Sequence, residues 1–274
     1  MRSHLRRIQI LSNQVIRNFT SGTAPGSDHQ YEVEKHTPDS SLDEKYPEDP
    51  GNHICLWPKD EHKYTLVWLH GLGDSAAGFY DLFNSDYYKM APKNTAVILM
   101  NAPIRAVTLN GGMRMTSWYD IEGIGFDEET GSKSINLEEL EESTQLVFRI
   151  MEQYSDKIDN DYSKYIVGGF SQGCCLAYNT FFRLDKTIKG LVAVSGHTPP
   201  VVGLDFSEEQ KKIPIFAYHG ANDPTVPEMI HRMGVKALKD KGLDISYKVE
   251  PGLVHSVSVQ EISEVKKFLE GITE

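Results

Sequence analysis

The sequence predicts an α/β fold with a mainly parallel central sheet, helices on both faces, and an N-terminal extension to a single domain. From about residue 54 to residue 274, short apolar runs rich in β-branched and aromatic residues alternate with helical stretches. Strands that are joined by helices form right-handed crossovers, which build a parallel sheet covered on both faces. The 274 residues include 39% hydrophobic and 24% charged residues, which suits one large globular domain.

Six apolar runs predict the strands, and they are residues 64–69, 95–100, 164–169, 188–194, 213–218 and 245–249. The clearest helix follows Asn136, which is a favourable N-cap, and Glu139 is placed to reach back to it. Further helices are predicted at residues 172–184, 226–240 and 258–270. Ligands bind beyond the carboxyl ends of parallel strands, so the residues that follow these runs are the first candidates for a site.

Two segments of different composition precede this domain. Residues 1–20 carry four arginines and no acidic residue, with apolar residues recurring on one helical face. This composition is typical of a mitochondrial transit peptide, so we expect a mitochondrial protein, or a cytoplasmic one if the segment is a basic tail or a partner-docking helix. Residues 21–53 are polar, acidic and rich in Pro and Gly, which predicts a linker or an extended arm.

Charge and cysteine content disfavour several classes of protein. Twenty-eight Lys and Arg against 39 Asp and Glu give a formal net charge of -11, whereas nucleic-acid binding relies on cations. No apolar run reaches the roughly 18 residues that span a bilayer. The three cysteines are Cys55, Cys174 and Cys175. Their odd number and the lack of any zinc-like Cys/His spacing predict neither a disulfide framework nor a metal site.

Residues 169–173 read Gly-Phe-Ser-Gln-Gly and join a predicted strand to a predicted helix. A strand–turn–helix of this kind, called a nucleophile elbow, forces Ser171 into a strained backbone and lifts its hydroxyl above the sheet. The two glycines leave room where a side chain would strike the neighbouring strand or helix. The plainer alternative is a Gly-rich turn with a serine helix cap.

Two later strand ends supply an acid and a base. Asp223 follows the run at 213–218, and His255 lies on the loop after the run at 245–249. A serine hydroxyl is a poor nucleophile without a base, so His255 would take its proton while Asp223 fixes the histidine tautomer. Each residue alone fits an ordinary turn or an exposed loop. Three placements at strand ends in the order Ser, Asp, His favour a catalytic triad.

Backbone donors for an oxyanion are predicted in two places. One is the N–H of Gln172, which follows the candidate nucleophile. The other is the glycine-containing loop after the first strand, most naturally the N–H of Leu72. Two preorganised N–H groups contribute several kcal/mol to transition-state stabilisation. A plain glycine-rich turn is the alternative.

The segments TLVWLHGLGDSAAGF, NAPIRAVTLNGGMRMTSWYDI, GFSQG, HGANDPTVP and GLVHS occur in this order. Together they resemble the acyl-protein thioesterase family, the small phospholipase/carboxylesterase branch of the α/β-hydrolases, over about residues 60–272. The resemblance implies hydrolysis of acyl thioesters on proteins or of carboxylic esters, without metal or cofactor. It also implies Ser171 as nucleophile, Asp223 as acid and His255 as base, with Leu72 and Gln172 as oxyanion donors.

Three features depart from the family pattern or extend it. Cys174 and Cys175 follow the candidate nucleophile, and we expect them to pack against the sheet as small hydrophobes. The loop at 103–121 is expected to roof the site, with Trp118 in contact with an acyl chain. His197 is expected beside the acyl groove, where it would affect chain-length preference.

A second hypothesis belongs to another class of protein. The basic start and the arm also fit an accessory subunit of a large mitochondrial membrane-protein complex, with partners bound through residues 1–53. Labelling of Ser171 by a fluorophosphonate favours the enzyme, whereas stoichiometric co-purification with a complex favours the subunit. The sequence does not predict the acyl length, the leaving group, cleavage of the N-terminus or the oligomeric state.

Overall fold

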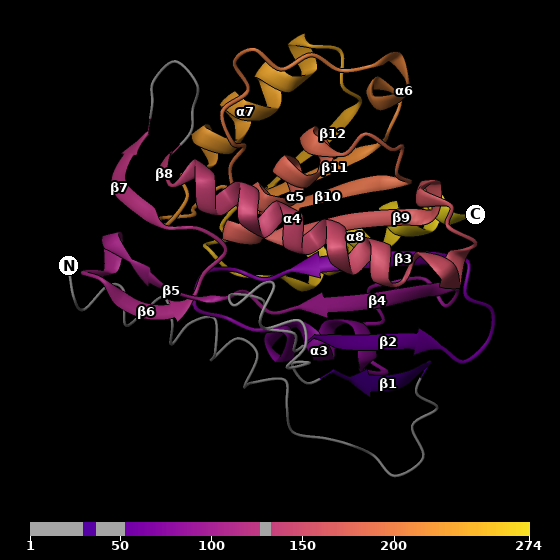
Figure 1. Cartoon of the computed structure of the whole chain (residues 1–274). Helices are drawn as coiled ribbons and strands as arrows, with labels where there is room; N and C mark the ends of the chain where they lie inside the picture. The colour runs from indigo at the N-terminus through magenta and orange to yellow at the C-terminus, as the bar shows by residue number, and fades with distance from the viewer. Residues whose placement is uncertain (1–29, 37–52, 127–132) are drawn as a thin grey trace.

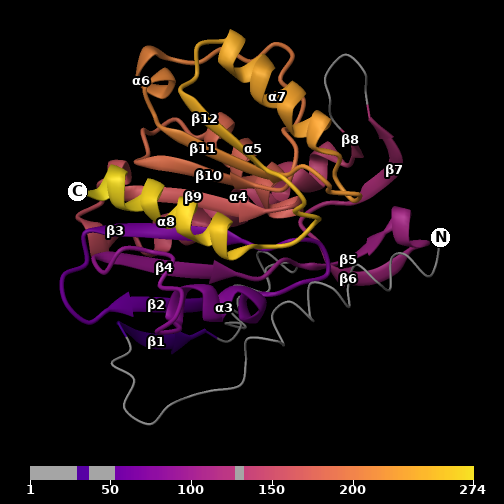
Figure 2. The same cartoon turned by 180° about the vertical axis from the view of Figure 1, so that it is seen from behind.

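A computed structural model describes residues 30–36, 53–126 and 133–274, and the structural statements below concern these residues (Figure 1). The predicted import segment at 1–20 lies outside them, as does most of the predicted arm at 21–53. The described chain forms an α/β domain around one large sheet, with helices on both faces (Figures 1 and 2).

The central sheet has eight strands in the order β1-β2-β4-β3-β9-β10-β11-β12. Neighbouring strands from β4 to β12 run parallel, whereas β1 and β2 pair antiparallel, as do β2 and β4. The predicted mainly parallel sheet is therefore confirmed. The bounds are β1 Tyr31–Lys35, β2 Ile54–Pro58, β3 Tyr64–Leu69, β4 Thr95–Met100, β9 Tyr165–Phe170, β10 Gly190–Val194, β11 Ile215–Gly220 and β12 Ile245–Glu250.

Two helical layers cover the sheet. One layer contains α4 (Leu137–Gln153), α5 (Gln172–Arg183) and α7 (Glu228–Asp240), and the other contains α3 (Ala76–Asn84) and α8 (Val259–Thr273) (Figures 1 and 2). Short helical turns complete the chain, namely η1 (Thr108–Asn110), η2 (Ser155–Ile158), η3 (Tyr162–Lys164) and α6 (Glu208–Lys211). Within the described ranges, no helix has the length and apolar character needed to cross a membrane.

Alternating side chains of the strands fill a core on each face. In β3, Val67 and Leu69 pack in the core under α4, α5 and α7, whereas Leu66 and Trp68 pack in the core under α3 and α8. Because both faces of a parallel sheet are covered, such a strand is apolar along its whole length. This explains why the predicted strand at 64–69 agrees with the structure at both ends.

The predicted arm is wrong for residues 30–36. The segment YEVEK forms β1, which pairs with β2 along its whole length. Tyr31 is buried in the core under α3 and α8, while the charged residues of β1 are exposed. Charged side chains are common on edge strands because they discourage pairing with other chains. The domain therefore includes a strand that precedes residue 54.

One of the two hydrogen bonds predicted at the N-cap of α4 is present. The Asn136 side chain accepts a hydrogen bond from the N–H of Glu139. The Glu139 carboxylate does not reach back; it accepts from the N–H of Asp120 and lies 3.3 Å from a guanidinium nitrogen of Arg105. The carboxylate thus ties the predicted roof segment to α4.

That segment is a hairpin rather than a loop. It contains β5 (Ile104–Val107) and β6 (Met113–Thr116), which pair antiparallel. A second small sheet follows, formed by β7 (Ile121–Phe126) and β8 (Lys133–Ile135). Both small sheets lie beyond the carboxyl ends of the parallel strands (Figure 1).

Candidate active site

Ser171 lies in the sharp turn between β9 and α5. Its backbone has φ 57° and ψ -114°, on the side of conformational space that L-residues seldom adopt. Its N–H donates to the carbonyl of Val194 at 2.9 Å, and its carbonyl accepts from the N–H of Cys174 at 3.1 Å. These bonds hold the turn and bring the hydroxyl to the carboxyl edge of the sheet, as the sequence predicts.

Three glycines give this turn the space it needs. A Cβ on Gly169 would lie 2.3 Å from the carbonyl oxygen of Gly173, and one on Gly173 would lie 2.1 Å from that of Leu69. A Cβ on Gly196 would lie 2.5 Å from the carbonyl oxygen of Ser171. The flanking glycines of the motif are therefore required by contacts with backbone atoms, which cannot turn aside.

The three residues predicted as a triad lie in one hydrogen-bonded row. His255 Nε2 is 2.9 Å from Ser171 Oγ, and His255 Nδ1 is 2.6 Å from Asp223 Oδ2. Because a carboxylate only accepts, Nδ1 carries the proton of the neutral imidazole and Nε2 is left to accept from the serine hydroxyl. The His255 side chain is 10% exposed, whereas that of Asp223 is fully buried.

Asp223 is held in its ionised form inside the protein. Burial alone would raise its pKa, but hydrogen bonds from His219 and His255, the charge of His255 and the N–H of Val226 together hold the pKa well below its usual range. Asp223 Oδ1 also accepts from the N–H of Thr225 at 2.8 Å. The carboxylate is therefore fixed in position by groups on both sides.

A chain of buried side chains lies behind Asp223. His219 Nε2 faces two acceptors, the carbonyl of Val226 at 2.8 Å and Asp223 Oδ2 at 3.3 Å, so this nitrogen carries the proton of the neutral ring. His219 Nδ1 then accepts from His231 Nδ1–H at 2.9 Å, and His231 Nε2 accepts from the Tyr178 hydroxyl at 3.2 Å. Burial and the neighbouring histidines lower the pKa of His231 well below its usual value. The sequence analysis did not identify this chain, because its members lie on β11, α7 and α5.

The predicted oxyanion donors flank Ser171 on two segments. Neither the N–H of Leu72 nor that of Gln172 donates a hydrogen bond to another group in the described part of the chain. The loop that carries Leu72 is fixed by His70, whose Nε2 accepts from the N–H of Ala102 at 3.0 Å and whose Nδ1 donates to the carbonyl of Gly71. Two N–H groups therefore remain for a ligand.

The Gln172 side chain adds a link that the sequence analysis did not identify. Its Oε1 accepts from the N–H of Trp118 at 2.9 Å, and its Nε2 donates to Ser117 Oγ and to the carbonyl of Tyr119. The Trp118 indole N–H donates to the carbonyl of His70 at 2.8 Å. The segment 117–119 thus joins the start of α5 to the loop after β3.

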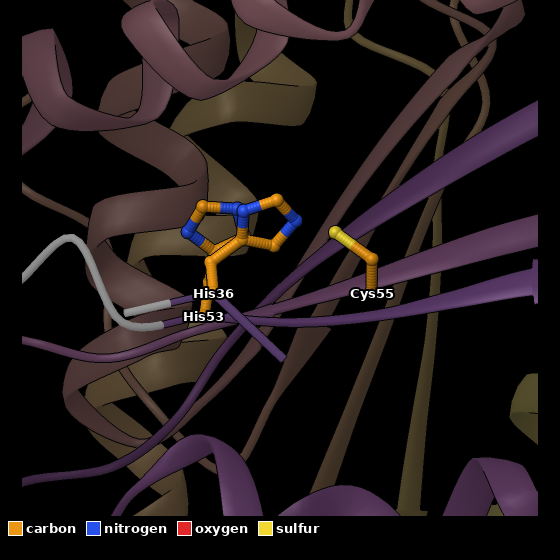
Figure 3. A group of neighbouring side chains, drawn as sticks. All are labelled: His36, His53 and Cys55. Carbon is orange, nitrogen blue, oxygen red and sulfur yellow. The ribbon is translucent and has the colours of Figure 1, made fainter. Parts of the chain in front are cut away.

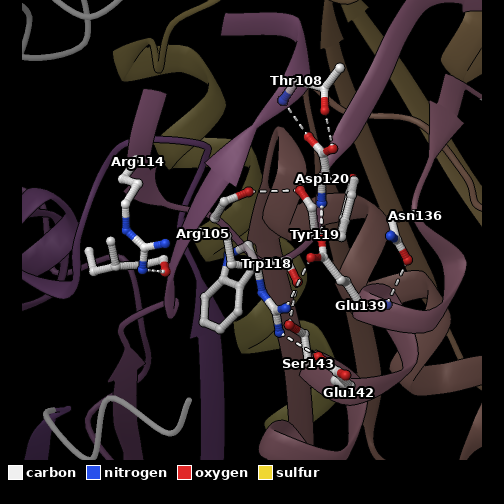
Figure 4. Close-up of polar contacts among 12 residues, drawn as sticks. Arg105, Thr108, Arg114, Trp118, Tyr119, Asp120, Asn136, Glu139, Glu142 and Ser143 are labelled. Carbon is white, nitrogen blue, oxygen red and sulfur yellow. Dashed lines mark hydrogen bonds and ion pairs between the residues drawn. The ribbon is translucent and has the colours of Figure 1, made fainter. Parts of the chain in front are cut away.

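Figure 4 shows how the same segment is fixed to α4. The buried guanidinium of Arg105 pairs with Glu139 and with Glu142, at 3.3 and 2.9 Å. The hydroxyl of Ser143 donates to the carbonyl of Trp118. These contacts anchor both the hairpin and the chain that follows it.

Trp118 and His197, which were predicted to contact substrate, are both buried. Trp118 is 0% exposed and His197 is 3% exposed, so neither presents a surface to a ligand. The chain after β10 turns inward at Ser195, which has φ 49°, and Gly196 packs on Cys174. A sequence pattern does not tell whether a side chain after a strand points out or in. Cys174 and Cys175 are fully buried free thiols, as expected of small hydrophobes.

The arrangement has the parts needed for nucleophilic acyl transfer. A hydroxyl lies within reach of an imidazole, the imidazole is oriented by a buried carboxylate, and two N–H groups lie on the flanking segments.

Comparison with known proteins identifies the family. The phospholipase/carboxylesterase family model matches residues 52–273. An acyl-protein thioesterase 1 homologue from Dictyostelium discoideum is 31% identical over 211 residues, which are 76% of this chain and 90% of that protein. The chain belongs to the phospholipase/carboxylesterase family of α/β-hydrolases, and it is therefore a hydrolase of the esterase and thioesterase class.

Solved structures agree with this assignment. SOBER1 from Arabidopsis thaliana is 28% identical, with a TM-score of 0.68 over 77% of this chain and 100% of that one. Acyl-protein thioesterase 2 from Zea mays is 26% identical, with a TM-score of 0.69 over 80% of this chain and 98% of that one. The comparisons lend no support to the accessory-subunit hypothesis.

We expect Gly173→Ala to destabilise the fold by about 3 kcal/mol or more, because the new Cβ meets backbone atoms of β3. Urea unfolding gives the measurement. Gly271→Ala is the matched control, since a Cβ at this position in α8 would meet no heavy atom within 4 Å apart from its chain neighbours and the adjacent backbone of its own helix. It should stabilise the fold by about 0.5–1 kcal/mol. Equal unfolding midpoints for the Gly173 variant and the native chain would contradict the described turn.

His70 should make the fold sensitive to acid. Burial lowers its pKa to about 4, while an unfolded chain has the usual value near 6.5. As pH falls from 6.5 to 4, the unfolded state takes up a proton that the folded state does not. The free energy of unfolding then falls by about 1.4 kcal/mol per pH unit from this residue alone. Urea titrations across this range should show a shallower pH slope for His70→Gln, and an unchanged slope would refute the assignment.

Proposed function

We propose that this chain is a serine hydrolase that cleaves acyl thioesters or carboxylic esters through an acyl-enzyme formed on Ser171. The observation that carries the proposal is the hydrogen-bonded row from Ser171 through His255 to the buried Asp223. The acyl-protein thioesterases among its relatives support the substrate class, which is an acylated protein or a small acyl ester. The proposed reaction uses no cofactor.

In the first step, Ser171 Oγ attacks the acyl carbonyl carbon while its proton passes to His255 Nε2. Asp223 stabilises the imidazolium that forms and keeps the ring in the required orientation. The carbonyl oxygen becomes an oxyanion, which the N–H groups of Leu72 and Gln172 stabilise. His255 then protonates the leaving thiolate or alkoxide as the C–S or C–O bond breaks.

In the second step, water releases the acid. His255 Nε2, again unprotonated, takes a proton from a water molecule that attacks the acyl-enzyme carbonyl. The same two N–H groups stabilise the second oxyanion, and the returning proton restores the Ser171 hydroxyl as the ester bond to the enzyme breaks. The reaction centre is the carbonyl carbon in both steps, so the same residues serve sulfur and oxygen leaving groups.

Ser171→Ala should abolish labelling by a fluorophosphonate and lower hydrolysis by at least about 1,000-fold. Short and long acyl thioesters and the matching oxygen esters are the substrates to compare. Ser163→Ala is the matched control, since Ser163 lies on η3 and binds only Asp161. It should keep both labelling and turnover. Hydrolysis that survives in the Ser171 variant would refute the proposed nucleophile.

We further propose that residues 1–20 direct the chain to mitochondria, on the basis of their four arginines and lack of acidic residues. A fluorescent protein fused behind residues 1–53 should then accumulate in mitochondria. The same fusion carrying Arg6→Glu and Arg7→Glu should remain in the cytoplasm. A cytoplasmic distribution of the unaltered fusion would refute import.

A further inference from the structure

Three residues with metal-binding side chains meet on one face of the β1–β2 pair. Glu34 lies opposite Cys55 in the antiparallel register, and the N–H of His36 donates to the carbonyl of His53 at 3.0 Å just beyond β1. Residues opposite each other share a face, as do residues two apart along a strand. His36, His53 and Cys55 therefore lie on the same side, with Glu34 next to them.

The ligand atoms of these residues are close together. One ring nitrogen of His36, one of His53 and the sulfur of Cys55 all lie within 4.8 Å of one another. Figure 3 shows the sulfur turned toward the two imidazole rings, which are stacked with centroids 4.4 Å apart. In a tetrahedral zinc site, ligand atoms lie about 3.3–3.7 Å apart, so small side-chain rotations bring these three to bonding distance.

The three ligand atoms also converge on one point. Each imidazole presents Nε2 to the hydroxyl of Tyr154, at 2.7 Å from His53 and 2.9 Å from His36, and the Cys55 thiol is close enough to interact with the same hydroxyl. Tyr154 reaches this point from the end of α4. Because the three side chains already face one region, a metal ion bound beside the Tyr154 hydroxyl would be within reach of all of them.

Burial and charge suit a bound cation. Cys55 is 0% and His53 is 6% exposed, so both side chains are buried inside the protein. The Glu34 carboxylate lies 3.1 Å from His36 Nε2 and adds negative charge. Lys157 is the nearby cation, but its ammonium group lies over the Trp57 ring.

We propose that His36, His53 and Cys55 bind a zinc ion, with the Tyr154 hydroxyl or a water molecule as the fourth ligand. A set of two imidazoles and a thiolate binds zinc in preference to calcium or magnesium, which favour oxygen ligands. The sequence shows no zinc spacing because residues 37–52 separate His36 from the other two ligands.

The ion would join the edge strand β1 to β2 and to the end of α4. Two strands, β4 and β3, separate β2 from β9 and its Ser171. The ion therefore has a structural role and takes no part in the chemistry at Ser171. Because metal that binds only the folded state stabilises it by mass action, zinc should raise the melting temperature of the full chain.

Cobalt titration of the purified full chain tests the proposal, because Co²⁺ reports thiolate ligation by a charge-transfer band. One equivalent should bind and give this band. Cys55→Ser should remove the band, and His36→Gln should weaken zinc binding by about 100-fold or more, since even the partners of metal ligands contribute 10–100-fold. His36 is partly exposed at the sheet edge, so this variant tests the site without disturbing the core.

Two matched variants serve as controls. Cys174→Ser removes a buried thiol elsewhere, and His62→Gln removes a partly buried imidazole that contacts Thr65. Both should bind cobalt like the native chain. Binding that survives in the Cys55 and His36 variants, or the lack of any thiolate band in the native chain, would overturn the site. None of these results bears on the proposed ester hydrolysis by Ser171, which the Ser171→Ala variant tests.

Discussion

The backbone of Ser171 is the constraint on which the rest of the site depends. A non-glycine residue held at positive φ costs about 1–3 kcal/mol, and the surrounding structure must supply that energy. Here β10 accepts the N–H of Ser171, and α5 begins in the next residue. Gly169, Gly173 and Gly196 bring backbone into contact with backbone around it. The same turn that exposes the hydroxyl also leaves the N–H of Gln172 without a partner in the described chain, so the proposed nucleophile and one proposed oxyanion donor depend on the same turn.

Buried hydrogen bonds and ion pairs also connect segments around the site that are distant in sequence. The Gln172 amide holds the backbone of 117–119, the Trp118 indole holds the loop after β3, and Arg105 holds the hairpin on α4. Each of these side chains is nearly inaccessible to water. Leaving one partner of a buried hydrogen bond unpaired costs about 1–3 kcal/mol, so the links are mutually dependent. The rim of the site is therefore as firmly specified as the hydrophobic core below it.

The features that the sequence predicted best are those that two independent patterns indicate. Strands β3 and β4 are apolar throughout because both their faces are covered, and the triad residues follow strand ends that a parallel sheet brings together. The sequence did not predict a strand with few buried residues, or the direction in which a side chain points. YEVEK reads as polar because Tyr31 is the one buried residue of β1. The sequence also did not predict that Trp118 and His197 are buried, because the direction of a side chain depends on the three-dimensional packing. The cluster of His36, His53 and Cys55 depends on a strand register that no local pattern encodes.

In the proposed mechanism, a comparison of the imidazoles around Asp223 favours one of them for proton transfer. His219 also lies close to its carboxylate, but its proton is directed at the carbonyl of Val226 and the ring is fully buried. In the described part of the chain, His231 is hydrogen-bonded to His219 and Tyr178, and its lowered pKa keeps it neutral. His255 alone combines a direct bond to the carboxylate, a bond to the Ser171 hydroxyl and partial exposure to solvent. A group that gains and loses a proton in each cycle needs all three, because the cation must be stabilised and the second proton comes from water. The hydrogen bond from His219 helps to hold Asp223 ionised, while His255 is the imidazole that contacts the Ser171 hydroxyl.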